Sequence, residues 1–244
     1  MSARKAKAAR RAARCGPAVP DAPAAWDGAV PREAIAAVVQ EVVTAEGRRV
    51  YGLVPEQMCL HFATVGAMMA RLATGRRYAL QIGGFAVHGL GGELLHSYGP
   101  GWGTEVRDRM FHSWFTAVPA GVSCEAAWAC PPWAEVCDLT LRYFTETDKA
   151  ARHGGRPPLP PWFWGSRTAM RDSTGVVYKP DRGVTMGVLA GTFAPGCDDH
   201  RWFAYACRTA AALLGLRMEG MVPLVPGSFL VGHRVPAGAL QLRG

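Results

Sequence analysis

The chain is 244 residues long, with 49% hydrophobic and 19% charged residues and a formal net charge of +8. This length suits one large domain or two small ones with a sizeable buried core. The longest apolar runs are interrupted by glycine, arginine or proline well short of the roughly 18 residues of a membrane-spanning helix. The composition therefore argues against an integral membrane protein and favours a soluble one.

Most of the positive charge lies at the N-terminus. Residues 1–14 contain six arginines and lysines and no acidic residue, so +6 of the net +8 falls in this segment. We expect residues 1–25 to form a disordered, solvated tail, and a basic tail can also contact nucleic acid or an acidic partner. Because Arg10 and Arg11 interrupt its alanines, the apolar segment of a secretory signal is missing, which predicts a cytoplasmic protein.

The seven cysteines are irregularly spaced, and none forms a CxxC pair. Without an export signal, we expect reduced thiols rather than a disulfide framework. Cys124, Cys130 and Cys137 are separated by five and six residues, which leaves a structural zinc site as the alternative. The scattered glycines of residues 88–109 do not form a phosphate-binding motif. Our prediction is that the protein uses no metal or organic cofactor.

Two helices are predicted in the N-terminal part of the chain. After Pro31, isoleucine and valine recur with the i, i+3, i+4, i+7 spacing of an amphipathic helix that covers the domain. A second helix begins at Pro55, a residue favoured in the first turn, and ends at Gly75. The second helix is apolar on nearly all sides, so we expect it to be buried at the centre of the domain.

The next part of the chain has the character of an antiparallel sheet. Residues 77–82 are typical of a strand that runs into a glycine pair, and residues 85–87 extend it. Residues 88–109 are rich in glycine and predict a loop beside the site or on the surface. The alternation of residues 110–118 and of residues 133–144 predicts two further strands.

The C-terminal part has weaker patterns. Residues 148–175 are rich in charge and proline and predict no regular element, whereas residues 176–178 and 184–189 are typical of short strands. Residues 202–214 predict a helix that ends before a glycine. The last 28 residues are expected to form two short strands or an extended segment.

A cysteine, a histidine and an aspartate occupy positions that suit nucleophilic catalysis. Cys59 lies near the start of the second helix, and His112 and Asp138 lie on consecutive strands. A cysteine attacks as the thiolate, whose pKa of about 8.5 is lowered by a helix N-terminus and by a neighbouring imidazolium. A carboxylate then orients the imidazole and stabilises its charged form. We predict this role for Asp138, with Asp108 and Glu135 as alternatives.

Further candidates lie around these three residues. The Cys59 N–H and the Gln57 side chain are the nearest donors for a developing oxyanion. Trp114 follows His112 by two residues, so the two side chains point the same way on a strand, and Trp114 lines either the cleft or the core. Trp102, in the glycine-rich segment, is a second candidate to cover a substrate cleft.

Four segments in this order resemble the core of bacterial transglutaminase-like proteins: EQMCLHFATVGAMMARLATG, RYALQIGG, FHSWFTA and EVCDLTLRY. They also resemble the leader-peptide proteases of lasso-peptide pathways, which belong to the same broad superfamily. The resemblance covers about residues 55–145. It implies an α+β fold with a papain-like or transglutaminase-like core, in which a central helix carrying the cysteine packs on an antiparallel β-sheet. Residues 26–244 would then form a single catalytic domain, with residues 146–244 as a C-terminal elaboration.

The function implied by this resemblance is that of a cysteine hydrolase or acyltransferase. It would act on an amide or ester bond of a peptide, a protein or a small amide through Cys59, His112 and Asp138 and a thioester intermediate. The alternative is a non-catalytic binding protein that retains the fold and docks its basic tail on nucleic acid or an acidic partner.

Overall fold

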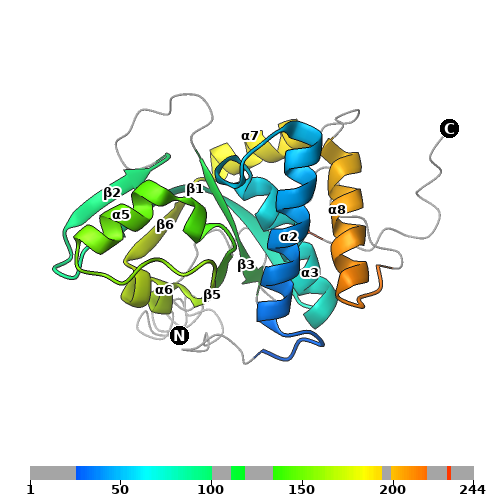
Figure 1. Cartoon of the computed structure of the whole chain (residues 1–244), viewed down its shortest axis with the longest axis horizontal. Helices are drawn as coiled ribbons and strands as arrows, with labels where there is room; N and C mark the ends of the chain where they lie inside the picture. Colours follow the sequence, from blue (N-terminus) through cyan, green and yellow to red (C-terminus); the bar gives the residue numbers. More distant parts are fainter. Residues whose placement is uncertain (1–25, 101–110, 119–133, 194–198, 219–229, 232–244) are drawn as a thin grey trace, which may run out of the picture.

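The computed structural model of the chain describes residues 26–100, 111–118, 134–193, 199–218 and 230–231. These residues form an α+β fold, in which helices cover a curled antiparallel sheet (Figure 1). The α-helices are α2 (Arg32–Tyr51), α3 (Cys59–Thr74), α5 (Thr145–His153), α6 (Arg167–Thr174), α7 (Arg182–Thr192) and α8 (Asp199–Leu213), with 3₁₀ turns η1 (Pro55–Gln57) and η2 (Leu141–Tyr143). The strands are β1 (Arg77–His88), β2 (Leu94–Tyr98), β3 (His112–Val118), β4 (Glu135–Asp138), β5 (Phe163–Ser166), β6 (Val176–Pro180) and β7 (Leu230–Val231).

The twelve-residue strand β1 organises the sheet. The strand order is β2-β1-β3-β4-β5, and β6 and β7 also pair with β1; every pairing is antiparallel. Gly83 of β1 pairs with both His112, at the start of β3, and Pro180, at the end of β6. The start of β3 and the end of β6 therefore meet at Gly83.

Helix α3 is the central element of one core. It packs against β1 and β3 and is covered by α2 and α8, which flank it in Figure 1. Close approach to the sheet depends on Gly66, because a Cβ there would lie 2.7 Å from Leu139 Cδ1 and 2.8 Å from Phe115 Cε1. Most residues of α3 are buried, as its uniformly apolar sequence predicts.

A second core lies on the other face of the sheet. Trp114 of β3 and Tyr178 of β6 are fully or almost fully buried there, together with Phe85 of β1. Helices α5 and α6 close this core with Ala151 and Met170. The first residue of β3 and the last residue of β4 lie beside this aromatic core, which positions the site described below.

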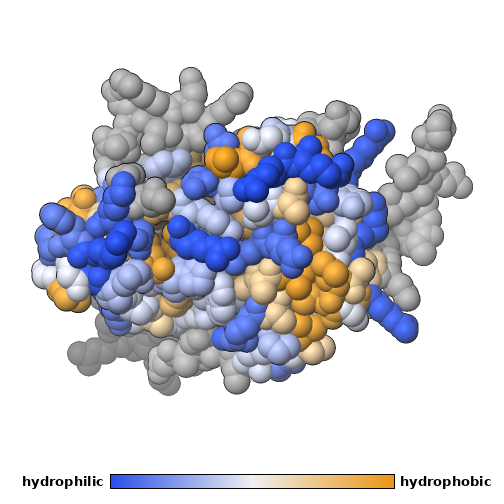
Figure 2. Space-filling model, viewed as in Figure 1, coloured by the Kyte–Doolittle hydropathy of each residue, from blue (hydrophilic) through white to orange (hydrophobic). Residues whose placement is uncertain are grey.

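The surface is unevenly polar. Figure 2 shows hydrophobic residues gathered over α2 and α8, whereas hydrophilic residues predominate over α5. Within the described part of the chain, no helix combines the length and the apolar character needed to cross a bilayer.

Several sequence predictions are confirmed. The helix after Pro31 is α2, the buried helix ends before Gly75, and the strand predicted from residue 77 continues through the glycine pair as β1. The strands predicted around residues 110–118 and 176–178 are β3 and β6, and the C-terminal helix is α8. The expected disordered tail of residues 1–25 lies outside the described residues.

Two boundaries and one element type differ from prediction. Pro55 begins the 3₁₀ turn η1 rather than the helix, and α3 starts at Cys59 because Met58 has φ −114° and ψ 19°. The strand predicted for residues 133–144 ends at Asp138, whose carboxylate accepts hydrogen bonds from Thr140 and turns the chain into η2. Residues 184–189 are helical, because the Asp181 side chain accepts a hydrogen bond from Val184 N (2.9 Å) and caps α7.

Elements without a prediction occur in two stretches. The glycine-rich segment contains the strand β2, which pairs with β1. Residues 148–175 include most of α5 and all of β5 and α6. These elements are short, and their sequences show no clear periodicity. Pairing with β1 and β4 fixes the conformation of β2 and β5.

Replacement of Gly83 by alanine is expected to destabilise the fold. The new Cβ would lie 2.1 Å from Lys179 O and 2.9 Å from Pro180 Cα, so the backbone of β6 would have to move. We expect a loss of about 2 kcal/mol in the free energy of unfolding, measured by urea denaturation. The control is Gly187→Ala in α7, where an added Cβ meets no atom within 4 Å and should stabilise the helix. Equal effects of the two substitutions would contradict the close approach of β6 to β1.

Candidate active site

A buried histidine–aspartate pair lies at the ends of two neighbouring strands. His112 begins β3, Asp138 ends β4, and each residue is only 1% exposed. His112 Nε2 lies 2.6 Å from Asp138 Oδ2. Because an ionised carboxylate can only accept, Nε2 carries a proton and donates a hydrogen bond to Asp138. Nδ1 is then the ring nitrogen that Asp138 does not use.

Both oxygens of the Asp138 carboxylate are hydrogen-bonded. Oδ1 accepts from Thr140 N (2.8 Å) and from Thr140 Oγ1 (2.7 Å). Oδ2 accepts from His112 and from the hydroxyl of Tyr178. Burial alone would raise the pKa of Asp138, but the charge of His112 and the hydrogen bonds from His112, Tyr178 and Thr140 outweigh burial and lower it. Asp138 is therefore a buried, ionised carboxylate.

The His112 ring is protonated at neutral pH. Burial lowers its pKa, but the charge and hydrogen bond of Asp138, with smaller contributions from the hydrogen bond and charge of Cys59, raise the pKa to about 9. This value lies above the ordinary 6.5, so the stabilisation by the pair is fully present below pH 6.5 and is lost as the pH rises through 9.

Cys59 is the first residue of α3 and lies beside the same ring. Its Sγ donates a hydrogen bond to Phe111 O at 3.7 Å, one residue before His112. The hydrogen bond and charge of Cys59 are among the smaller causes that raise the pKa of His112, which agrees with a thiol that lies near the ring. Because Nε2 is engaged by Asp138, Nδ1 is the ring nitrogen that remains for a second partner. Nδ1 is buried and makes no well-formed hydrogen bond in the described part of the structure. Cys59 itself keeps 7% of its surface exposed.

The position of Cys59 at the start of α3 also provides a backbone N–H group that can donate a hydrogen bond to a substrate. In the first turn of a helix, backbone N–H groups have no carbonyl acceptor within the helix. The N–H of Cys59 is one of these groups in α3. The arrangement therefore combines a thiol, a protonated imidazole, a buried carboxylate and a free backbone donor, which together can support nucleophilic attack on a carbonyl carbon.

Aromatic side chains enclose the histidine. The edge-to-face contacts come from Phe85 and Phe144, with ring centroids 5.2 and 4.8 Å from His112. The stacked contacts come from Tyr178 at 5.7 Å and Trp114 at 6.0 Å. This surrounding apolar surface excludes water from the pair and strengthens its electrostatic interactions.

Tyr98, at the end of β2, packs on two of the aromatic side chains that enclose His112. Burial and the charge of Cys59 raise the pKa of its hydroxyl. Its ring stacks on Phe85 at 5.5 Å and contacts Phe144 at 6.0 Å. Tyr98 is only partly buried.

The other predicted site residues have different positions. Gln57 is exposed, and its Oε1 accepts from Val54 N at 3.5 Å, so its side chain caps η1 instead of pointing at an oxyanion. Trp114 has no exposed surface, so it lies in the core and does not line a cleft. Trp102 lies outside the described residues.

Glu135, one of the two alternative carboxylates, and His61, the histidine nearest to Cys59 in sequence, have other partners. Glu135 accepts from Trp164 Nε1 at 2.6 Å and lies within 3.4 Å of Arg76, away from His112. His61, two residues from Cys59, is packed between Trp202 and Phe203 of α8, and burial lowers its pKa to about 4 despite the opposing charge of Asp199. Asp108 lies outside the described residues.

Of the three cysteines of the zinc alternative, Cys137 is the one that lies within the described residues. Cys137 is buried, and burial raises the pKa of its thiol. Cys124 and Cys130 lie outside the described residues, and no cluster of metal-ligating side chains occurs among the residues that are described. Cys207 is likewise a buried thiol, with its pKa raised to about 12 by burial.

Two site residues have no counterpart in the sequence prediction. Thr140 follows Asp138 by two residues, and an Asp-x-Thr turn could have been proposed from that spacing. Tyr178 lies 40 residues from Asp138, and only the pairing of β6 with β1 brings it into the site. No local pattern identifies such a residue.

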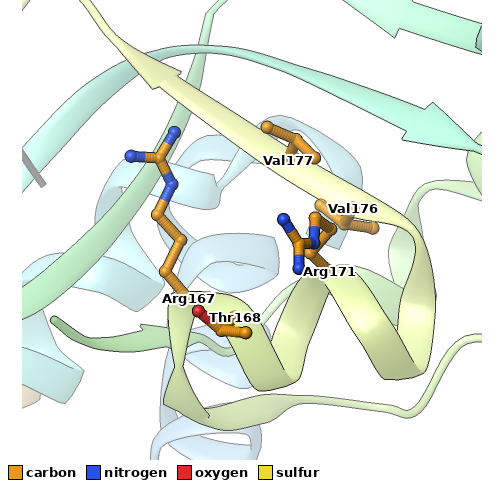
Figure 3. Close-up of a pocket in the computed structure, with 5 residues that line it drawn as sticks. All are labelled: Arg167, Thr168, Arg171, Val176 and Val177. Carbon is orange, nitrogen blue, oxygen red and sulfur yellow. The ribbon is translucent and has the colours of Figure 1, made fainter. Parts of the chain in front are cut away.

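A pocket of about 270 Å³ lies between α6 and β6, next to the strand that carries Tyr178 (Figure 3). Its walls include Arg167, Arg171 and Val177, and both guanidinium groups extend from α6 towards β6 in Figure 3. Arg167 Nη2 donates to Tyr178 O at 2.7 Å, and Arg171 lies 2.9 Å from Asp172. Arg167 thus fixes the backbone of β6 beside the site.

Comparisons with known proteins do not identify a family. No protein-family model matches the sequence, and no curated protein matches it. Among solved structures, a crystal structure described as "genomics APC5867" is similar over 85% of this chain and 94% of that chain, with 16% identity and a TM-score of 0.44. This description names no function, and a similarity of this size does not establish a shared fold.

Proposed function

We propose that the protein is a cysteine hydrolase or acyltransferase with a papain-like or transglutaminase-like core, and that it acts on an amide or ester carbonyl. Cys59 is the nucleophile, His112 transfers the proton and Asp138 orients the ring. One observation carries the proposal: the ring of His112 donates to the buried Asp138 at 2.6 Å while Cys59, at the start of α3, interacts with the same ring.

The first half of the reaction is acylation. Cys59 Sγ bonds to the carbonyl carbon, and the negative charge that develops on the carbonyl oxygen is stabilised by the Cys59 N–H. His112 then gives its Nδ1 proton to the leaving nitrogen or oxygen as the C–N or C–O bond breaks. The product is a thioester on Cys59 and a released amine or alcohol.

The second half is deacylation. A water molecule attacks the thioester carbonyl and gives its proton to His112 Nδ1, and the C–S bond breaks to restore the Cys59 thiolate and release an acid. An amine in place of water would give a new amide. Hydrolysis is the simpler proposal, because water needs no dedicated acceptor site. We place this activity in the cytoplasm, where the thiol of Cys59 stays reduced.

Labelling with iodoacetamide across a pH series tests this proposal. We expect Cys59 to be alkylated below pH 8 faster than glutathione and at least about tenfold faster than Cys137 and Cys207, because the His112 imidazolium and the start of α3 stabilise the thiolate. The buried thiols Cys137 and Cys207 are internal controls, since burial raises the pKa of each. Mass spectrometry gives the rate at each cysteine.

The variant His112→Ala separates an activated thiol from an accessible one. It removes the imidazolium and should slow the alkylation of Cys59 at pH 7 while leaving Cys137 and Cys207 unlabelled. If Cys59 reacts no faster than glutathione, and His112→Ala changes nothing, the catalytic proposal fails. The alternative, a binding protein that retains the fold, would then be favoured.

A further inference from the structure

Tyr178 brings a hydroxyl to the site from a part of the chain that lies beyond residues 55–145. It is 1% exposed, its hydroxyl donates to Asp138 Oδ2, and its ring stacks on Trp114 at 4.4 Å and on His112 at 5.7 Å. We propose that Tyr178 is a positioning residue: its hydroxyl fixes the second oxygen of Asp138 and thereby holds the His112 ring with Nδ1 facing Cys59. The catalytic meaning of this role rests on the proposed function.

The geometry of the carboxylate explains why a second anchor matters. Thr140 holds Oδ1 with two hydrogen bonds, but both come from one residue that is two positions away in the same turn. Oδ2 is the oxygen that His112 uses, and the Tyr178 hydroxyl is the donor that holds it from another strand. Without this hydroxyl, the His112 ring would be the one remaining donor to Oδ2 among the residues that the structure describes, and this ring is the group that the carboxylate has to orient.

Tyr178 is itself well anchored. It pairs with Phe85 in the β1–β6 ladder, and its carbonyl accepts from Arg167 Nη2 at 2.7 Å. Two separate elements, β1 and α6, therefore fix the backbone that carries the hydroxyl. It follows that residues 163–180 complete the site and are more than a covering of the core.

The Tyr178 hydroxyl also weakens the attraction between the Asp138 carboxylate and the His112 ring. Tyr178 and His112 share Oδ2, so part of the negative charge of this oxygen is offset by the tyrosine O–H dipole. When the hydroxyl is removed, the negative charge of Oδ2 is no longer partly offset and attracts the imidazolium more strongly. This attraction favours the protonated ring and raises the pKa of His112. The two bonds from Thr140 hold only Oδ1, so the carboxylate stays beside the ring during this change while its Oδ2 end loses its second anchor.

The experiment is an NMR titration of the His112 ring in the full-length protein and in Tyr178→Phe, with the resonance assigned by its absence in His112→Gln. Phenylalanine keeps the ring that stacks on Trp114 and removes only the hydroxyl. We expect the wild-type midpoint near pH 9 and the midpoint of Tyr178→Phe to be higher by about one pH unit. In parallel, the rate of p-nitrophenyl acetate cleavage at pH 7 should fall about tenfold.

Tyr51→Phe is the matched control. The Tyr51 hydroxyl donates to Asp199 at 2.6 Å, so this variant also removes a tyrosine–carboxylate bond, but outside the site. Its His112 midpoint and esterase rate should equal those of the wild type. An unchanged or lower midpoint in Tyr178→Phe would overturn the positioning role, including the case in which only thermal stability falls. If the wild type does not cleave the ester but the midpoint moves as stated, the proposed function fails and the positioning role stands.

Discussion

Cys59→Ala is expected to reduce the rate of ester or amide cleavage by more than about a thousandfold, because the variant has no atom that can form the thioester. The remaining groups, His112, Asp138 and the free N–H at the start of α3, are left in place. They can still bind and polarise a carbonyl, so a small residual rate above the uncatalysed reaction is expected. The measurement is the cleavage of p-nitrophenyl acetate by the two purified proteins under identical conditions.

A second thiol provides the control for this prediction. Cys207 is fully buried in the core between α3 and α8, away from His112. Cys207→Ala should lower the stability slightly, because it leaves a small cavity, and should keep the cleavage rate of the wild type. A Cys59→Ala protein that is folded and retains the wild-type rate would show that this thiol is not the nucleophile.

The elements that carry Cys59 and His112 could be predicted from the sequence because each has a strong local pattern. The apolar run that ends at Gly75 predicts a buried helix, and the alternation around His112 predicts a strand. The start of α3 was less accessible, since Pro55 is compatible with both a 3₁₀ turn and a first helical turn. The actual start at Cys59 places the thiol directly at the helix N-terminus.

The support around Asp138 could be predicted only in part. Thr140 is near in sequence, whereas Tyr178 reaches the site through the pairing of β6 with Phe85 of β1. Long-range strand pairing leaves no trace in the local pattern of either segment. Residues 184–189 were mispredicted for a different reason: Val184, Thr185 and Val188 are β-branched residues typical of a strand, but the cap at Asp181 favours a helix.

Side-chain direction was the least predictable feature. Trp114 does share a face with His112, as a two-residue spacing on a strand requires, but that face is covered by α5, α6 and Tyr178. Gln57 lies close to Cys59 in sequence, yet its amide oxygen turns back to Val54 N. A capping hydrogen bond of this kind competes with a role in the site, and the sequence gives no basis for choosing between the two.

Asp138→Asn is expected to lower the cleavage rate by about 10²- to 10⁴-fold through the wrong tautomer of His112. Thr140 donates two hydrogen bonds to Oδ1, so the amide oxygen of asparagine must take this position and its NH₂ group must face His112 Nε2. Nε2 then has to accept, and the ring proton moves to Nδ1, the nitrogen that faces Cys59. A neutral ring in this state cannot take the proton of the thiol.

The pH profile distinguishes this mechanism from simple unfolding. The charge and hydrogen bond of Asp138 are what raise the pKa of His112 to about 9 against the effect of burial, so the wild-type rate should decline above pH 9. In Asp138→Asn this support is lost while burial remains, and the decline should begin at a markedly lower pH. Asp199→Asn, which alters the carboxylate bonded to Tyr51, is the control and should keep the wild-type profile. Because loss of folded protein lowers the rate without moving its pH limits, a profile of Asp138→Asn that still declines near pH 9 would contradict the assignment of His112 and Asp138 as a functional pair.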